Sequence, residues 1–184
     1  MNTAHHLAPL LPTSWLQHLG QLSTATQLSQ ALWRSAPKLF SRDAKDLLQQ
    51  MQNAAGDELR LHPHGAQLIL QAQRQDHVDS AGVHSSRKHW GLHAIHLIAQ
   101  HPSSAVWCGP WPGKVAPAQL TPEKLLLALG ADTSQSMLSP CMACFSLQAD
   151  AQQQWGVTGV FEQGLLSLHI VRISPWQHLQ ATPA

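Results

Sequence analysis

Residues 107–130 read WCGPWPGKVAPAQLTPEKLLLALG and contain the clearest helix start and stop signals in the chain. Thr121 offers a side-chain oxygen as an N-cap, and Pro122 suits the first helical position because its missing N–H needs no partner there. Glu123 places negative charge at the positive end of the helix dipole. Four leucines follow as an apolar face, and Gly130 is suited to a left-handed terminator. The sequence therefore predicts a short helix between these two caps.

On the N-terminal side of this stretch, the first third of the chain carries helix patterns. Apolar residues recur there at spacings of three and four, which is typical of amphipathic helices. Polar N-cap residues precede the patterns, and Gly or Pro follows them. The expected helices cover 14–22, limited by Gly20; a segment that begins after Ser23 or Thr24 and ends at Pro37; and a segment capped by Ser41, with Asp43 in its first turn, that ends between Asn53 and Gly56.

The pattern changes to strand-like alternation at Glu58. Alternating apolar and polar residues on both sides of a Pro-His-Gly turn predict a β-hairpin with one buried face. The following polar segment, 74–89, has no periodicity and is predicted to be an exposed loop. Further strands are expected at 90–99 (a central strand), 105–108, 141–147, 154–162 and 165–173, the last two being joined by a tight turn at Gln163-Gly164.

Runs of helices followed by runs of strands favour an α+β fold over strict β-α alternation. We therefore predict N-terminal helices followed by a mainly antiparallel sheet, with one short capped helix inserted. At 184 residues the chain is expected to form a single domain over 1–184. Its helical part is expected at 1–56 and its β-rich part at 57–175, with the inserted helix at 121–130.

Composition limits the class of function. Only 11% of the residues are charged and the formal net charge is +1, so the sequence lacks the basic footprint of a nucleic-acid-binding protein. The apolar runs are too short to span a bilayer, and Pro9 and Pro12 interrupt the N-terminal segment where a secretory signal would need a continuous apolar core. Three cysteines do not make a disulfide framework. A cytoplasmic protein that contacts neither membrane nor nucleic acid is expected.

Two groups of residues have spacings that metal sites use. Cys141 and Cys144 form a CxxC pair, but only Cys108 is left to join them, so the main expectation is that both thiols pack in the core. His93 and His96 would point to opposite faces of a regular strand and could not share an ion. A metal site is therefore not predicted, and no cofactor is expected.

Catalytic motifs are missing from the sequence. It contains no HExxH, GxSxG or Walker-type glycine loop, and its glutamates are isolated from one another. Paired acids and bases, which hydrolytic chemistry needs, are not visible. The chain is therefore predicted not to be an enzyme.

Four segments together suggest a family. WGLHAIHLIAQ, VWCGPWPGKV, LTPEKLLLALG and WGVTGVFEQGLLSLHIVRI resemble, in this order, small bacterial immunity-type proteins that are paired with antibacterial toxins of type VI secretion or contact-dependent systems. The resemblance extends from about Glu58 to Ile173 and lies in topology more than in chemical residues. It implies an inhibitor that binds and neutralises a cognate toxin protein by stoichiometric contact.

A toxin would be contacted by exposed residues, and the predicted loop at 74–89 offers four of them: Asp76, His77, Asp79 and His84. Two alternatives remain open. The chain is a zinc-binding enzyme or sensor that uses Cys108, Cys141 and Cys144, or a secretion adaptor or chaperone whose N-terminal helices form a groove for a client helix.

Overall fold

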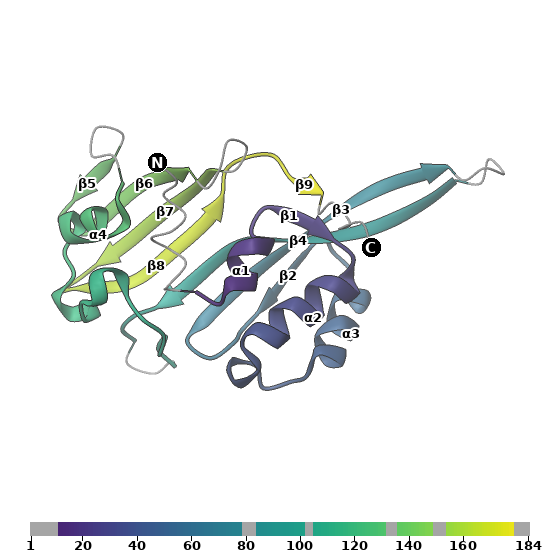
Figure 1. Cartoon of the computed structure of the whole chain (residues 1–184), viewed down its shortest axis with the longest axis horizontal. Coiled ribbons are helices and arrows are strands. Elements are labelled where there is room, and N and C mark those ends of the chain that lie inside the picture. The colour runs from purple at the N-terminus through teal and green to yellow at the C-terminus, as the bar shows by residue number, and fades with distance from the viewer. Residues whose placement is uncertain (1–10, 79–83, 102–104, 132–135, 149–153, 179–184) are drawn as a thin grey trace.

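The protein was analysed as a computed structural model, which describes residues 11–78, 84–101, 105–131, 136–148 and 154–178. The predicted α+β fold is confirmed (Figure 1). The helices are α1 (Thr13–His18), α2 (Ala25–Ser35), α3 (Ala44–Asn53) and α4 (Pro122–Leu129), with single 3-10 turns η2 (Pro37–Leu39), η3 (Pro112–Lys114) and η4 (Pro117–Gln119). The strands are β1 (Gln21–Ser23), β2 (Glu58–Leu61), β3 (Ala66–Val78), β4 (His84–Ile98), β5 (Met137–Ser139), β6 (Met142–Gln148), β7 (Gln154–Phe161), β8 (Leu165–Arg172) and β9 (Gln177–His178).

The strands form one sheet in the order β2-β3-β4-β8-β7-β6-β5. All neighbours along this path are antiparallel. β4 pairs with β3 along its whole length and divides its other edge between two partners. At Trp90 and Gly91 that edge pairs with β1, and from Ala94 to Ile98 it pairs with β8. β9 adds a short parallel partner to β1. The long strand β4 therefore holds the two halves of the sheet together.

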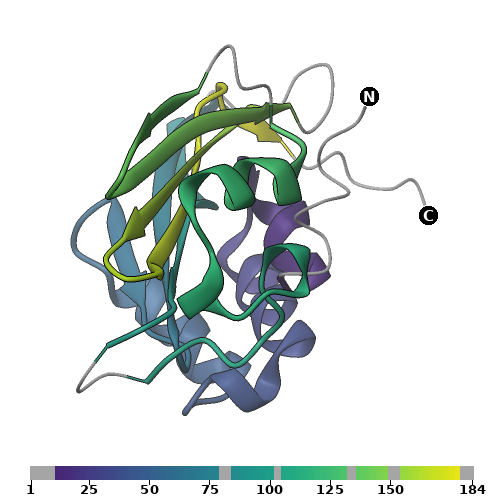
Figure 2. The same ribbon diagram turned by 90° about the vertical axis from the view of Figure 1, so that its left-hand side faces the viewer.

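All four α-helices lie on one side of the sheet (Figure 2). Their apolar faces and the sheet face beneath them form one buried cluster that includes residues from α1 to β8. The fully buried Trp15 of α1 lies near its centre, with its ring centroid 5.9 Å from that of Trp107 and 6.3 Å from that of Phe40. The first residue of the 107–130 stretch therefore packs directly against the N-terminal helices.

The helix caps were predicted with one error. Thr121 accepts from the Lys124 amide and Gly130 ends α4 with φ 62°, as expected. Thr24 begins α2 with a complete capping box, in which Gln27 bonds back to the Thr24 amide. The cap of α3 was assigned wrongly, because Asp43 rather than Ser41 accepts from the Asp46 amide. An ionised carboxylate near the positive end of a helix is a stronger acceptor than a hydroxyl.

Four strand predictions were also wrong. The segment 105–108 is not a strand, although the Trp107 amide donates to the Ile98 carbonyl (2.7 Å). The short strand β1 lies inside the part expected to be helical, and β9 follows Pro175, where the last strand was expected to end. The largest error concerns 74–89, most of which is strand: β3 continues to Val78 and β4 starts at His84. The residues of this segment are mostly polar, so apolar and polar side chains do not alternate. Hydrogen bonding between two strand backbones does not depend on such alternation.

No helix in the described ranges is long and apolar enough to cross a membrane.

The turn between β2 and β3 provides a test of the packing. Gly65 has φ +72°, and a Cβ added to it would lie 2.3 Å from the Val106 carbonyl. We expect Gly65→Ala to lower the free energy of unfolding by more than about 2 kcal/mol, since strained backbone and an unrelieved clash add together. Urea titration measures this change.

The matched control is Gly56→Ala, where the nearest atom to an added Cβ is 3.9 Å away. Its stability should change by less than about 1 kcal/mol. An equal change in the free energy of unfolding for Gly65→Ala and Gly56→Ala would contradict the close approach of the 105–107 backbone to this turn.

Candidate binding surface

The β3–β4 hairpin extends far beyond the strands beside it. β2 pairs with β3 only as far as Gln71, and β1 pairs with β4 only at Trp90 and Gly91. Beyond these points, within the part of the chain that the structure describes, the two strands pair only with each other, from Gln73↔His89 to Val78↔His84. Figure 1 shows this segment projecting from the body as a two-stranded ribbon. We call residues 73–78 and 84–89 the hairpin arm.

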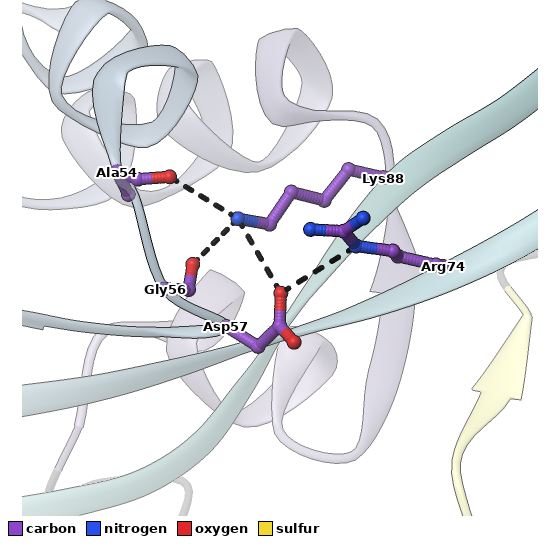
Figure 3. A network of polar contacts seen from close by, with 5 residues as sticks. All are labelled: Ala54, Gly56, Asp57, Arg74 and Lys88. Atoms are coloured by element: carbon purple, nitrogen blue, oxygen red, sulfur yellow. Dashed lines mark hydrogen bonds and ion pairs between the residues drawn. The ribbon is translucent and has the colours of Figure 1, made fainter.

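The base of the arm is fixed by Lys88 (Figure 3). Its ammonium group donates to the carbonyl oxygens of Ala54 (3.3 Å) and Gly56 (2.5 Å), which lie between α3 and β2. The same nitrogen is 3.6 Å from a carboxylate oxygen of Asp57, and Arg74 approaches that oxygen at 3.9 Å. Two strands and one loop therefore share a single charged junction. Such charge-assisted bonds are stronger than neutral ones, and the Lys88 side chain is only 25% exposed.

An open hollow of about 590 Å³ lies beside this junction. It is bordered by Asp57 and Glu58 on one side and by residues 71–74 of β3 on the other. Carboxylates and a guanidinium thus border the same concave surface, which suits polar side chains of a protein partner better than an apolar ligand. The hollow and the arm together form a continuous candidate binding surface.

The structure places three of the four predicted contact residues on the arm. Asp76 and His77 belong to β3, where they pair with Ser86 and Ser85. His84 begins β4 and pairs with Val78. Asp79 lies outside the described residues. The four residues were predicted to occupy a loop, and the described three lie instead in a regular hairpin ladder, which gives their backbone positions a defined register.

The three cysteines do not form a common site. Cys108 and Cys141 are exposed, and Cys144 is half-buried. The expectation that Cys141 and Cys144 both pack in the core was wrong, because Cys141 lies in the turn before β6 and only Cys144 is on the strand. The Cys144 thiol donates to the Thr158 hydroxyl at 3.6 Å. Among the described residues, no three His, Cys, Asp or Glu side chains lie close enough to hold a metal ion.

The histidines of β4 are arranged differently from the expectation. Ile69 pairs with Ala94 and Leu70 with Leu92, so His93 is an extra residue at a β-bulge. Leu92 and Ile95 both face the core, which places His93 and His96 together on the opposite face of the sheet. The prediction that they point to opposite faces was wrong because a bulge shifts the alternation by one residue.

His96 also has a neighbour on β8. It pairs directly with His169, and the two ring centroids are 5.7 Å apart with an interplanar angle of 68°. Burial lowers the pKa of both imidazoles, and the charged form of His169 would lower the pKa of His96 further. The pKa of His93 is lowered by burial and by the nearby Arg172. This face therefore holds three imidazoles that favour the neutral form.

Sequence reasoning did not identify Lys88 or His169 as residues of interest. The role of Lys88 depends on contacts with a loop about thirty positions earlier in the chain, and the position of His169 opposite His96 depends on strand register. A single sequence displays neither of these. The alternation of Leu168, His169 and Ile170 is a sequence signal that could have placed His169 on the face away from the core, where the structure has it.

No family model, curated protein or solved structure matches the chain, so its function has to be inferred from its own residues.

Replacement of Lys88 tests the junction. We expect Lys88→Met to lower the free energy of unfolding by about 1 kcal/mol, because it leaves the Ala54 and Gly56 carbonyls without their charged donor. Amide hydrogen exchange in the arm should also become faster, since the base of the ribbon is no longer fixed.

The adjacent Arg87 has an exposed side chain, so Arg87→Met is a matched control that should change neither quantity. The role of the junction would be refuted if both variants exchanged at the same rate as the unmodified protein.

The histidine face predicts a pH dependence of stability. His93, His96 and His169 have folded-state pKa values below 6.5, so the unfolded chain takes up protons first as the pH falls. The stability is complete above about pH 7 and decreases below about pH 6.5, by up to about 1.4 kcal/mol per pH unit for each such group. Urea titrations at pH 7.5 and 5.5 measure this difference, which should become smaller in His96→Gln and His169→Gln. A stability that is equal at the two pH values would contradict the neutral state of these rings.

Proposed function

We propose that this protein is an immunity-type inhibitor, which binds one cognate antibacterial toxin by stoichiometric protein–protein contact and performs no chemistry. The observation that carries the proposal is the hairpin arm, a two-stranded ribbon that projects from the body and is fixed at its base by Lys88. A two-stranded hairpin is only marginally stable in water by itself. Here the hairpin projects beyond the rest of the sheet, and its base is held by the Lys88 contacts. This arrangement is well suited to presenting the hairpin to a partner.

The backbone of the arm supports binding by strand addition. Within the described ranges, neither of its strands pairs with a third strand, so its outer edges can accept an extended segment of a partner. Main-chain hydrogen bonds would then supply affinity, and side chains of alternating direction would supply specificity. The predicted contacts Asp76, His77 and His84 occupy this ribbon. The arm also carries both signs of charge, which matches a specific protein surface better than a uniformly charged one.

Inhibition by shape and specific contact fits the charge of the chain better than mimicry of nucleic acid does. The formal net charge is +1, whereas a nucleic-acid mimic needs a strongly acidic surface. In this proposal the protein acts in the cytoplasm of the cell that it protects, and the arm blocks the toxin by occupying its active site without chemistry of its own. That the chain is not an enzyme remains a prediction.

The two alternatives have less support from the geometry. The zinc-binding reading required Cys108, Cys141 and Cys144 to converge, and the described structure does not bring three metal ligands together. The adaptor reading required an apolar groove on the N-terminal helices. Their apolar residues are buried in the core instead, where they pack against each other and the sheet: Leu28 and Leu32 of α2, and Leu47 and Met51 of α3.

The test begins with affinity capture of the tagged protein from its native cells, followed by mass measurement of the intact complex. The captured protein is then expressed alone and together with this chain. We expect a complex of fixed stoichiometry, cell death when the partner is expressed alone, and survival on co-expression. A partner that is harmless when expressed alone would contradict the proposal.

A shortened arm tests which surface is used. Residues 76–86 are replaced by Asn-Gly, which closes the Gln75↔Arg87 pair with a two-residue turn and keeps the Lys88 junction. We expect the affinity for the captured partner to fall by at least about 100-fold, because a central contact element is removed.

The control is Leu127→Ser, a change at a side chain that is 84% exposed on α4, at the other end of the sheet from the arm (Figure 1). It should bind with unchanged affinity. Full affinity in the shortened variant would exclude the arm as the contact surface.

A further inference from the structure

His96 and His169 form a side-chain pair that the proposed binding function does not use. They lie directly opposite each other on the neighbouring antiparallel strands β4 and β8, and they alternate with the buried core residues on either side of them, which places them on the sheet face away from the core. Their ring centroids are 5.7 Å apart, and both rings are half-buried. In the described part of the chain, neither ring takes part in a hydrogen bond. Two imidazoles with uncommitted nitrogens thus face each other across one pair of strands.

We propose that His96 and His169 are the two protein ligands of a binding site for a divalent first-row transition-metal ion, of which Zn²⁺ is the best fit. Imidazole is a preferred ligand of this class of ion, and water would complete the coordination because only two protein ligands are present. The site differs from the one considered for the cysteines, and it requires none of them.

The ring separation is close to what a shared ion demands. A Zn–N bond of about 2.1 Å places an imidazole centroid roughly 3.2 Å from the ion, so two rings at a tetrahedral angle have centroids about 5.2 Å apart. The observed 5.7 Å is wider by a small amount that rotation about the side-chain torsions can supply. No movement of the strands is needed.

Two further properties of the pair favour metal binding: the neutral form of its imidazoles and the position of its strands inside the sheet. Burial lowers the pKa of both rings, so their nitrogen lone pairs are available at neutral pH without the release of a proton. β4 lies between β3 and β8, and β8 lies between β4 and β7, so neither strand is at an edge. Gln67 and Thr158 are the next residues in the same cross-strand row. Ligands on paired central strands keep their relative position before the ion arrives.

The charged neighbours of the pair determine how binding depends on pH. His93 acts electrostatically on His169, and Arg172 acts on His93, so both of these basic neighbours disfavour the charged form of the ring that they act on. Glu58 acts on His93 with the opposite sign. Protonation of the imidazoles competes with the metal ion, and affinity should therefore fall steeply from pH 7.5 to pH 5.5.

Isothermal titration calorimetry of the full chain with zinc chloride at pH 7.5 tests the proposal. We expect one Zn²⁺ per chain, and an affinity at least tenfold lower in both His96→Gln and His169→Gln. The double variant should bind no more weakly than either single variant, because either substitution alone breaks the chelate. Circular dichroism confirms that each variant is folded.

Two control variants separate this site from other sources of zinc binding. His62→Gln/His64→Gln removes two exposed histidines beside the β2–β3 turn, and Cys141→Ser removes an exposed thiol. Both should bind zinc as the unmodified protein does. The proposal is overturned if the chain binds no zinc, or if binding survives in His96→Gln and is lost in either control.

Paramagnetic broadening by Cu²⁺ provides a structural readout of the same site. Added below one equivalent, the ion should selectively broaden the ring proton signals of His96 and His169 in the NMR spectrum. Broadening confined to other histidines would place the site elsewhere and refute the assignment.

Discussion

Backbone pairing along β4 is the constraint on which the rest of the structure depends. β3 occupies one edge of this strand throughout, while β1 and β8 divide the other edge between them. The helices of the first third reach the sheet through β1, and the closing β6-β7-β8 meander reaches it through β8. Within the described residues, the first six positions of β4, from His84 to His89, pair with β3 alone. A single strand thus connects the packed core to the projecting ribbon, with its buried apolar residues at one end and its polar residues at the other.

The same strand separates two chemical environments. Its core face carries fully buried residues such as Leu92 and Ile95, while the opposite face carries half-buried histidines. Helices cover only the first of these faces (Figure 2). Imidazoles on the uncovered face are buried enough for the neutral form to be favoured. They are also exposed enough for an ion from solution to reach them. The arm lies at one end of β4, and the histidine pair lies toward the other end, where β8 supplies His169. The proposed protein binding and the proposed metal binding are therefore independent of each other.

Local patterns were sufficient to predict much of the fold. The caps Thr121 and Gly130 define a helix by chemistry that involves only neighbouring residues, and alternation in 154–162 and 165–173 identified the last hairpin. The arm was mistaken for a loop because its sequence is almost entirely polar and has no hydrophobic alternation to detect. The bulge at His93 and the contacts of Lys88 depend on residues distant in sequence, so the arrangement of the histidines and the base of the arm could not be predicted. The predicted contact residues that the structure describes were expected in a loop and lie in strands instead, and their contact with a partner stays a prediction.

The central claim is that the arm is the surface that meets a partner protein. Hydrogen–deuterium exchange of the chain, free and in its purified complex, tests this claim most directly, because amides at open strand edges exchange quickly until a partner covers them. The account predicts that binding slows exchange most in residues 73–78 and 84–89, with smaller changes around Asp57 and Glu58 at the hollow. Slower exchange confined to the helices or to the β5 edge, with the arm unchanged, would contradict it.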